Sequence, residues 1–233
     1  MSNFFATNAI YEPMKLFSIE HIIGLIICFI LQFVVLRYAK KDNKWLCKTL
    51  SILIIIEECF NFGWLFKAGA RFLLIRGLPL WHCSVAMILL IIASFNNNEK
   101  LLKLGSYFGF IGSLCALIFP GSLLNYHFSF PHIVHISHFS AHLYLLLVSS
   151  YNLFIRKIGM TKQDYKFAMI VVLIFNIIMS IYNAIMGTNY AFVTKLLYGS
   201  FCAPPIASLI IVTIYFWALA GILYFLIKYN KIK

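Results

Sequence analysis

Four histidines fall within twelve residues of the sequence, in the stretch PHIVHISHFSAH at positions 131–142. They are His132, His135, His138 and His142, and His127 lies shortly before them. Imidazole rings bind metals, act as general bases and line wet interfaces, so this cluster allows three kinds of site. Which kind it forms depends on where the segment lies relative to a membrane.

A metal site is the first alternative. Zinc needs three or four nitrogen, sulfur or oxygen ligands in a tetrahedral arrangement. HxxH spacing can supply two ligands on one helical face, and a cysteine or glutamate elsewhere can add a third. However, the cluster contains no carboxylate, and the sequence has no HExxH motif. We therefore expect no metal and no other cofactor.

An interfacial location explains His127, His132 and His135, because amphipathic rings at a membrane surface need no further role. His138 and His142 are one turn apart and share a helical face. His142 lies deeper in its helix, where a lone polar ring is better explained by a function such as that of a general base.

A candidate nucleophile is Cys83, in the stretch GLPLWHCS. Pro79 suits a helix start, which would place His82 and Cys83 in the first turn. The positive end of the helix dipole favours a thiolate at that position. The alternative is that Cys83 is an inert packing residue of an apolar helix.

A cysteine–histidine couple for acyl transfer needs a thiolate, a base and donors for the oxyanion. Cys83, His142, and Asn183 or Asn189 have suitable side chains for these three roles. The sequence does not show whether they meet.

Two adjacent carboxylates, Glu57 and Glu58, stand in the apolar stretch IIIEECFNFGW. An ionisable group at the centre of a membrane helix costs about 2.5–3.5 kcal/mol on insertion scales. The two side chains point about 100° apart on a helix, so we expect one to face the interior and the other to pair with a neighbouring helix or to be protonated. A purely structural role between helices is the alternative.

The composition places all of these residues in a membrane protein. The 233 residues are 62% hydrophobic and 11% charged, with a mean hydropathy of +0.90, whereas a soluble domain is about a quarter charged. We predict an all-α, polytopic bundle that forms a single transmembrane domain over residues 1–233. The expected spans are Ile19–Tyr38, Leu46–Phe66, Leu78–Phe95, Leu101–Phe119, Ser137–Phe154, Tyr165–Met186 and Ile206–Ile227. The amino-terminal sequence does not resemble a cleaved signal peptide, so we expect the first span to be retained.

The net charge of +12 is a topology signal rather than a nucleic-acid-binding surface. Most Lys and Arg residues fall in the loops and tail on one side of seven spans, which predicts an external N-terminus and a cytoplasmic C-terminus in the cell membrane. The histidine cluster and Cys83 then lie on the outer side. Cys202 lies there too, so a disulfide with Cys83 is geometrically possible, although the spacing does not favour it.

Other polar residues are predicted at the same level. His21 follows the start of the first helix, and Asn183 lies near the end of the sixth, which Gly187 closes before Asn189 and Tyr190. Several helices therefore send a polar group towards one outer site.

The chain resembles the YwaF-type integral membrane proteins of bacteria, which are related to vertebrate transmembrane protein 164. The resemblance covers most of the chain and is carried by FSIEHIIGL at 17–25, LPLWHC at 78–83, FPHIVHISHFSAH at 130–142 and YNAIMGTNY at 182–190. It implies a fatty-acyl transferase that acts on membrane phospholipids through a cysteine nucleophile, with a lysophospholipid or a lipoprotein amino terminus as acceptor.

On that resemblance Cys83 is the nucleophile and His142 its partner. The implied pocket consists of His21, Glu57, Glu58, His82, His138, Asn183, Asn189 and Tyr190. The family commonly has His or Gln two residues before the cysteine, where this chain has Trp81. That difference leaves it open whether His82 belongs to the pocket.

Two other classes of function fit the sequence. Converging polar groups also suit the small-ligand pocket of a transport component. Because the sequence has no GxxxxGKS motif, such a component would depend on a separate ATPase. The third possibility is a structural or assembly protein whose polar residues only hold helices together. No feature of the sequence indicates an oligomeric state.

Overall fold

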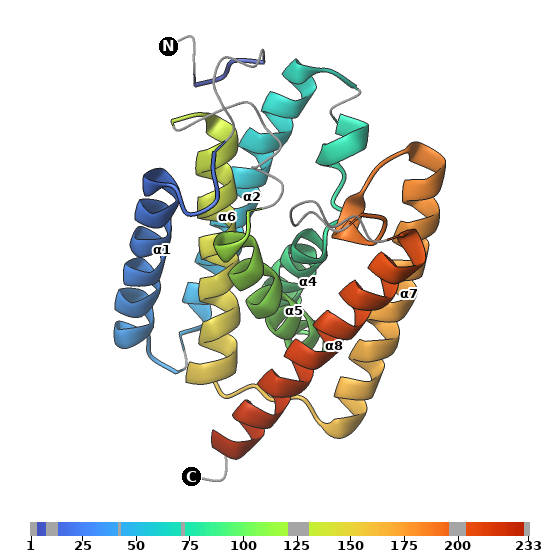
Figure 1. The fold of residues 1–233 in the computed structure, drawn as a ribbon. Helices are drawn as coiled ribbons and strands as arrows, with labels where there is room; N and C mark the ends of the chain where they lie inside the picture. Colours follow the sequence, from blue (N-terminus) through green and yellow to red (C-terminus); the bar gives the residue numbers. More distant parts are fainter. Residues whose placement is uncertain are drawn as a thin grey trace.

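The computed structural model describes residues 4–7, 14–41, 43–70, 73–120, 131–195 and 204–230. This part of the chain contains seven long α-helices and no strand (Figure 1), which confirms the predicted all-α class. The helices are α1 (Ile19–Tyr38), α2 (Lys44–Ala68), α4 (His82–Asn96), α5 (Glu99–Ile118), α6 (Ile133–Ser150), α7 (Lys162–Met186) and α8 (Pro205–Asn230). Three short helical segments accompany them: η1 (Leu73–Gly77), η3 (Tyr151–Ile155) and η4 (Tyr190–Phe192).

Six of these helical segments are long and apolar enough to span a membrane, and α6 is one of them together with its extension η3. The predicted bounds of α1 match the structure. Three helices begin earlier than predicted, each directly after a capping residue. His132 caps α6, Thr161 forms a capping box with Asp164 at α7, and Asn98 caps α5. A capping side chain satisfies amide groups that the helix itself leaves unpaired, so each helix extends back to its cap.

The third span differs from its prediction. The helix α4 begins at His82, four residues after the expected Leu78. Pro79 disfavours a helical Leu78, the amide of Leu80 instead closes a tight turn on the carbonyl of Leu78 (2.7 Å), and Trp81 is extended. With 15 residues, α4 is about 22 Å long and therefore shorter than the roughly 30 Å hydrocarbon core of a bilayer.

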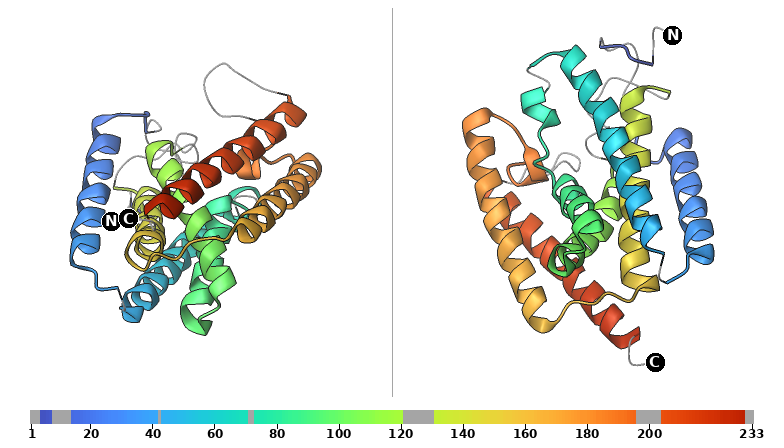
Figure 2. Two further views of the ribbon diagram at one scale, coloured as in Figure 1. Left: turned by 90° about the horizontal axis from the view of Figure 1, so that it is seen from below. Right: turned by 180° about the vertical axis from the view of Figure 1, so that it is seen from behind.

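The helices form one bundle with α1 at one edge and α7 and α8 at the other (Figures 1 and 2). The helices α2, α4, α5 and α6 make the most extensive contacts with one another. We call the lower end in Figure 1, where α1, α4, α6 and α8 finish, the basic end, and the opposite end the histidine end. By the positive-inside rule, the basic end is expected to face the cytoplasm.

Burial is concentrated in the middle of the bundle. Among the candidate spans, α6 with η3 and α5 are the most buried, and α1 is the least buried. Exposed Ile and Phe side chains cover α1, α7 and α8, as expected for helices that face lipid. Buried polar side chains, such as Ser51, Ser94 and Asn152, lie inside the bundle, where other helices can satisfy them.

Three glycines, Gly105, Gly109 and Gly112, let α5 approach its neighbours closely. A Cβ atom on Gly109 would collide with Ser149 Oγ and lie 2.9 Å from Leu145 Cδ1, both on α6. A Cβ atom on Gly112 would lie 3.5 Å from the Cα and Cβ atoms of Cys83, an ordinary contact distance. Small residues at a membrane helix interface permit such backbone approach.

Replacing Gly109 with alanine is therefore expected to destabilise the protein by about 1–3 kcal/mol, because the α5–α6 contact must open. Gly112→Ala is the matched control, and it should be tolerated since its new methyl group meets no short contact. Thermal unfolding of the purified variants in detergent measures the difference. Equal melting temperatures for the two variants would contradict this packing.

Candidate active site at the start of helix α4

Cys83 is the second residue of α4 and a free thiol. Trp81, the residue that precedes the helix, makes no side-chain capping bond. The amide groups at the start of the helix therefore have no capping side chain. The backbone N–H and the hydroxyl of Ser84 both lie within hydrogen-bonding reach of the Cys83 sulfur. This geometry supplies donors to a developing thiolate or oxyanion.

From the length of α4, Cys83 is expected to lie within the thickness of the membrane rather than at its surface. If the end of α4 marks the basic interface, the helix rise from Asn96 to Cys83 is roughly 20 Å, less than the roughly 30 Å of hydrocarbon. The backbone before α4 is irregular. At such a depth, irregular backbone is stable only where protein covers it and pairs its polar groups.

The loop that follows α7 provides this cover. The hydroxyl of Tyr190 donates to the carbonyl of Leu74 (3.0 Å) and accepts from the amide of Leu78 (3.2 Å). The Trp81 ring packs against Tyr190 and Phe192, with centroids 5.3 Å and 5.0 Å apart. Tyr190 therefore supports the segment that carries Cys83.

Asn183 and Asn189 shape the same loop. The Asn183 oxygen accepts from the Thr188 hydroxyl and the Tyr190 amide (2.7 and 2.8 Å), and its Nδ2 donates to the Tyr190 carbonyl (2.8 Å). The Asn189 oxygen accepts from the amide of Lys195 (2.9 Å), and its Nδ2 donates to the Lys195 carbonyl (2.8 Å). Gly187 ends α7 in the left-handed conformation (φ 64°), as predicted. These bonds give both amides a structural role, and the uncapped start of α4 offers the more direct oxyanion donors.

His82 points away from Cys83 and towards α7 and α8. Its Nε2 donates to Asn176 Oδ1 (2.7 Å), and Asn176 Nδ2 donates to the Thr213 hydroxyl (2.9 Å). The His82 ring stacks on Phe216, with centroids 4.0 Å apart. Successive residues of a helix point about 100° apart, which separates the surroundings of His82 from those of Cys83.

Glu57 and Glu58, both on α2, interact with two different neighbouring helices. Glu57 Oε2 accepts from the Ser137 hydroxyl of α6 (3.1 Å). Glu58 bonds to Asn61 one turn along its own helix and interacts electrostatically with the Cys83 thiol on α4. Glu57 thus contacts α6, whereas Glu58 is the member of the pair that interacts electrostatically with Cys83.

His21 and His138 cap the carboxyl-terminal end of α5. His21 Nε2 donates to the carbonyl of Leu117 (2.9 Å), and His138 Nε2 donates to that of Ala116 (3.1 Å). Carbonyls at a helix end have no partner within the helix. Because a carbonyl only accepts, each Nε2 carries hydrogen; His21 Nδ1 in turn accepts from the Phe17 amide (3.0 Å), which makes the ring neutral.

Replacing His21 with phenylalanine is expected to destabilise the protein by about 1–3 kcal/mol, because the Leu117 carbonyl loses its donor in a dry environment. His135→Phe is a suitable control, since neither ring nitrogen of His135 has a hydrogen-bond partner in the described part of the chain. The comparison uses melting temperatures in detergent. An equal loss of stability in both variants would show that the cap is unimportant.

His142 differs from His21 and His138 because one of its ring nitrogens, Nε2, has no hydrogen-bond partner among the described residues. Its Nδ1 donates to the carbonyl of His138 (2.7 Å), so that the lone pair of the neutral ring lies on Nε2. That atom is buried, and it has no hydrogen-bond partner among the described residues. A buried histidine that is oriented through one nitrogen and free at the other has the arrangement of a general base.

His142 and Cys83 lie at the same level of the bundle. The helices α5 and α6 are antiparallel; Ala116 meets His138 and Gly109 faces Leu145. Moving one residue forward along α5 therefore corresponds to moving one residue back along α6. This register places Gly112 opposite His142. Gly112 is also the residue that approaches Cys83. Cys83 and His142 therefore both lie beside α5 at the level of Gly112.

The remaining histidines were predicted to be interfacial. His132 and His135 are only 3% and 2% exposed, so they are buried within the protein and not on its wet surface. His132 caps α6 through Nδ1, and its Nε2 donates to the Ala6 carbonyl (2.9 Å). Burial lowers the pKa of His132, which keeps the ring neutral and Nδ1 able to accept. Residues 4–7 thereby lie against the histidine end, where the amide of Ile133 also donates to the carbonyl of Phe4 (3.0 Å). His127 and Cys202 lie outside the described residues.

The described residues contain no group of three or more His, Cys, Asp or Glu side chains arranged to hold a metal ion. The chain has no significant match among curated proteins or solved structures. The model of the TMEM164 family matches residues 16–229, a range that includes every side chain of the candidate site. The chain, a multi-pass helical membrane protein, therefore belongs to the TMEM164 family.

Proposed function

We propose that the chain is a membrane-embedded fatty-acyl transferase in which Cys83 is the nucleophile and His142 the base. The observation that carries the proposal is the free, buried Nε2 of His142 at the level of the Cys83 thiol. The family match supports a membrane protein of this kind, and the chemistry is inferred from the residues.

The first half-reaction would transfer an acyl chain from a phospholipid to the protein. The Cys83 proton moves to His142 Nε2 as sulfur attacks the ester carbonyl carbon. The bond between that carbon and the glycerol oxygen breaks, and Nε2–H returns its proton to the departing oxygen. The products are an acyl thioester on Cys83 and a lysophospholipid.

The second half-reaction reverses these roles. A hydroxyl of a lysophospholipid, or the amine of a lipoprotein, gives its proton to Nε2 and attacks the thioester carbonyl. The carbon–sulfur bond breaks, and sulfur recovers a proton from Nε2–H. Both halves need only the chain's own side chains and two lipids, which fits our expectation that no cofactor takes part.

The surroundings of Cys83 favour proton transfer during attack over a standing thiolate. An apolar membrane environment disfavours a lasting charge on the thiol sulfur. The Ser84 N–H and hydroxyl compensate when charge develops on sulfur or on the carbonyl oxygen. Such a transfer needs a nearby base, which is the role that we propose for His142.

The depth of the site suits a lipid substrate. An acyl chain occupies the hydrocarbon region, and the candidate nucleophile lies inside that region near the histidine end. We therefore propose that the substrates come from the leaflet at the histidine end, which the charge distribution predicts to be the outer leaflet of the cell membrane.

Acyl transfer can be tested directly in nanodiscs that contain a phospholipid with deuterated acyl chains and an unlabelled lysophospholipid. Lipid mass spectrometry should find deuterated chains on the former lysophospholipid with the wild type and none with Cys83→Ala. A transport component would instead move no label, and its ligand binding would survive loss of the thiol. Absence of transfer to lysophospholipid and to lipoprotein peptides alike would refute the proposal.

A further inference from the structure

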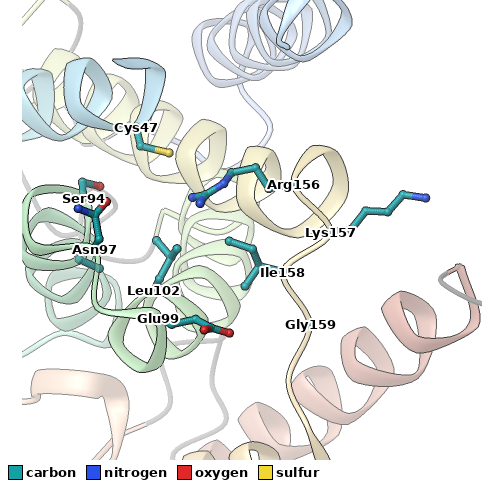
Figure 3. A pocket seen from close by; sticks show the side chains of 10 residues that line it. Cys47, Ser94, Asn97, Glu99, Leu102, Arg156, Lys157, Ile158 and Gly159 are labelled. Atoms are coloured by element: carbon teal, nitrogen blue, oxygen red, sulfur yellow. The ribbon is translucent and has the colours of Figure 1, made fainter. Parts of the chain in front are cut away.

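A second site lies at the basic end, at the other end of α4 from Cys83. A partly open cavity of about 460 Å³ is bordered there by the start of α2, the end of α4, the start of α5 and the segment after η3 (Figure 3). Its lining is polar for a membrane protein. It includes Cys47, Ser94, Asn97, Glu99 and Arg156.

One cationic side chain is directed into this cavity. Figure 3 shows the guanidinium group of Arg156 pointing towards Cys47 and Ser94, whereas Lys157 points away from the other labelled side chains. Arg156 donates to the neutral amide oxygen of Asn152 (2.9 Å), and it forms no ion pair with a carboxylate among the described residues. No described carboxylate therefore compensates its charge.

The described carboxylates near the cavity pair with Lys103 rather than with Arg156. The Glu99 carboxylate is paired with Lys103 (3.0 Å), which also contacts Asp164 (3.3 Å). The positive end of the α5 dipole lies at the same place, because Glu99 is the first residue of that helix. Behind Arg156, Asn152 is fully buried, and its Nδ2 lacks a hydrogen-bond partner in the part of the chain described.

We propose that the basic-end cavity binds a phosphate group, held by the Arg156 guanidinium and the start of α5. The guanidinium fork matches the oxygen atoms of a phosphate, and an anion is favoured at a helix amino terminus. The ligand is either the headgroup of an anionic phospholipid in the leaflet at this end or a soluble phosphate. This site is separate from the Cys83 chemistry and does not depend on it.

The test compares full-length wild type, Arg156→Gln, Lys157→Gln and Glu99→Gln in detergent. Native mass spectrometry measures binding of dioleoylphosphatidic acid, with dioleoylglycerol as the lipid that lacks phosphate. Arg156→Gln should bind phosphatidic acid about tenfold more weakly or worse, since a charge-assisted bidentate contact is lost. Lys157→Gln, the neighbouring cation that points elsewhere, should bind like the wild type.

Glu99→Gln is expected to change the affinity for phosphatidic acid in the opposite direction. It removes a negative charge from the lining and leaves Lys103 paired with Asp164 alone, so phosphatidic acid should bind more tightly. This variant decides the question if Arg156→Gln does not fold: weaker binding by Glu99→Gln would overturn the proposal. Equal losses in Arg156→Gln and Lys157→Gln would also overturn it, because binding would then reflect surface charge.

A parallel titration with inorganic phosphate distinguishes the two sources of ligand. Stabilisation by millimolar phosphate that disappears in Arg156→Gln identifies a site for soluble phosphate. Binding of phosphatidic acid without any response to inorganic phosphate identifies a lipid headgroup site. Dioleoylglycerol binding as tightly as phosphatidic acid would show that phosphate is not recognised.

Discussion

Replacing Cys83 with serine is expected to lower acyl transfer by at least about 10³-fold, because a nucleophile removed from a catalytic couple leaves only binding and oxyanion stabilisation. A hydroxyl in this membrane-embedded position ionises far less readily than a thiol. The fold should be retained, since serine is slightly smaller than cysteine and meets the same neighbours at Gly112. Transfer of deuterated chains and thermal unfolding, measured on the same preparation, separate the two effects.

Cys59→Ser is the matched control for this experiment. Cys59 is also a free cysteine, but it is exposed on α2 and borders no candidate catalytic group on another helix. It should keep wild-type activity. Undiminished transfer by Cys83→Ser, or equal losses in both variants, would remove Cys83 from the mechanism.

His142→Gln is expected to slow transfer by about 10²–10⁴-fold, the usual contribution of a positioned general base. The Gln amide can still donate to the His138 carbonyl, but it offers no basic nitrogen to the thiol. Both half-reactions should slow, because each needs a proton to leave a nucleophile. Rates of label transfer at saturating lipid are the relevant measurement.

His135→Gln serves as the control, since His135 lies on the same helix, is equally buried and bonds to none of the described residues through its ring nitrogens. Its activity should stay near that of the wild type. If His135→Gln lost as much activity as His142→Gln, the effect would belong to the packing of α6 rather than to a base.

Much of the fold was predictable because the length and hydropathy of membrane helices can be read from the sequence. The bounds of α1 and the glycine that ends α7 were correct. The start of α4 was misplaced, because a proline suits a helix start and a turn alike. The choice between them depends here on the turn at Leu78–Leu80 and on Tyr190, more than a hundred residues further along the chain.

The candidate site was harder to predict because polarity alone does not tell a functional side chain from a structural one. The sequence predicted polar groups of several helices at one level, and His21 and Asn183 are buried. It could not show that His21 and His138 cap α5 or that Asn183 shapes a turn. Such roles depend on which carbonyl lies opposite each ring. The helix-start donors and the basic-end cavity were missed, because backbone groups and enclosed spaces leave no residue pattern.

The intact mass of the purified protein after incubation with phospholipid, for the wild type and for Cys83→Ala, shows whether Cys83 carries an acyl thioester. We expect a mass increase of one acyl chain in the wild type, removed by hydroxylamine and absent from Cys83→Ala. A hydroxylamine-sensitive adduct in both proteins would place the thioester on another cysteine. No adduct in the wild type, even when the acceptor is withheld so that the thioester accumulates, would contradict covalent catalysis by Cys83.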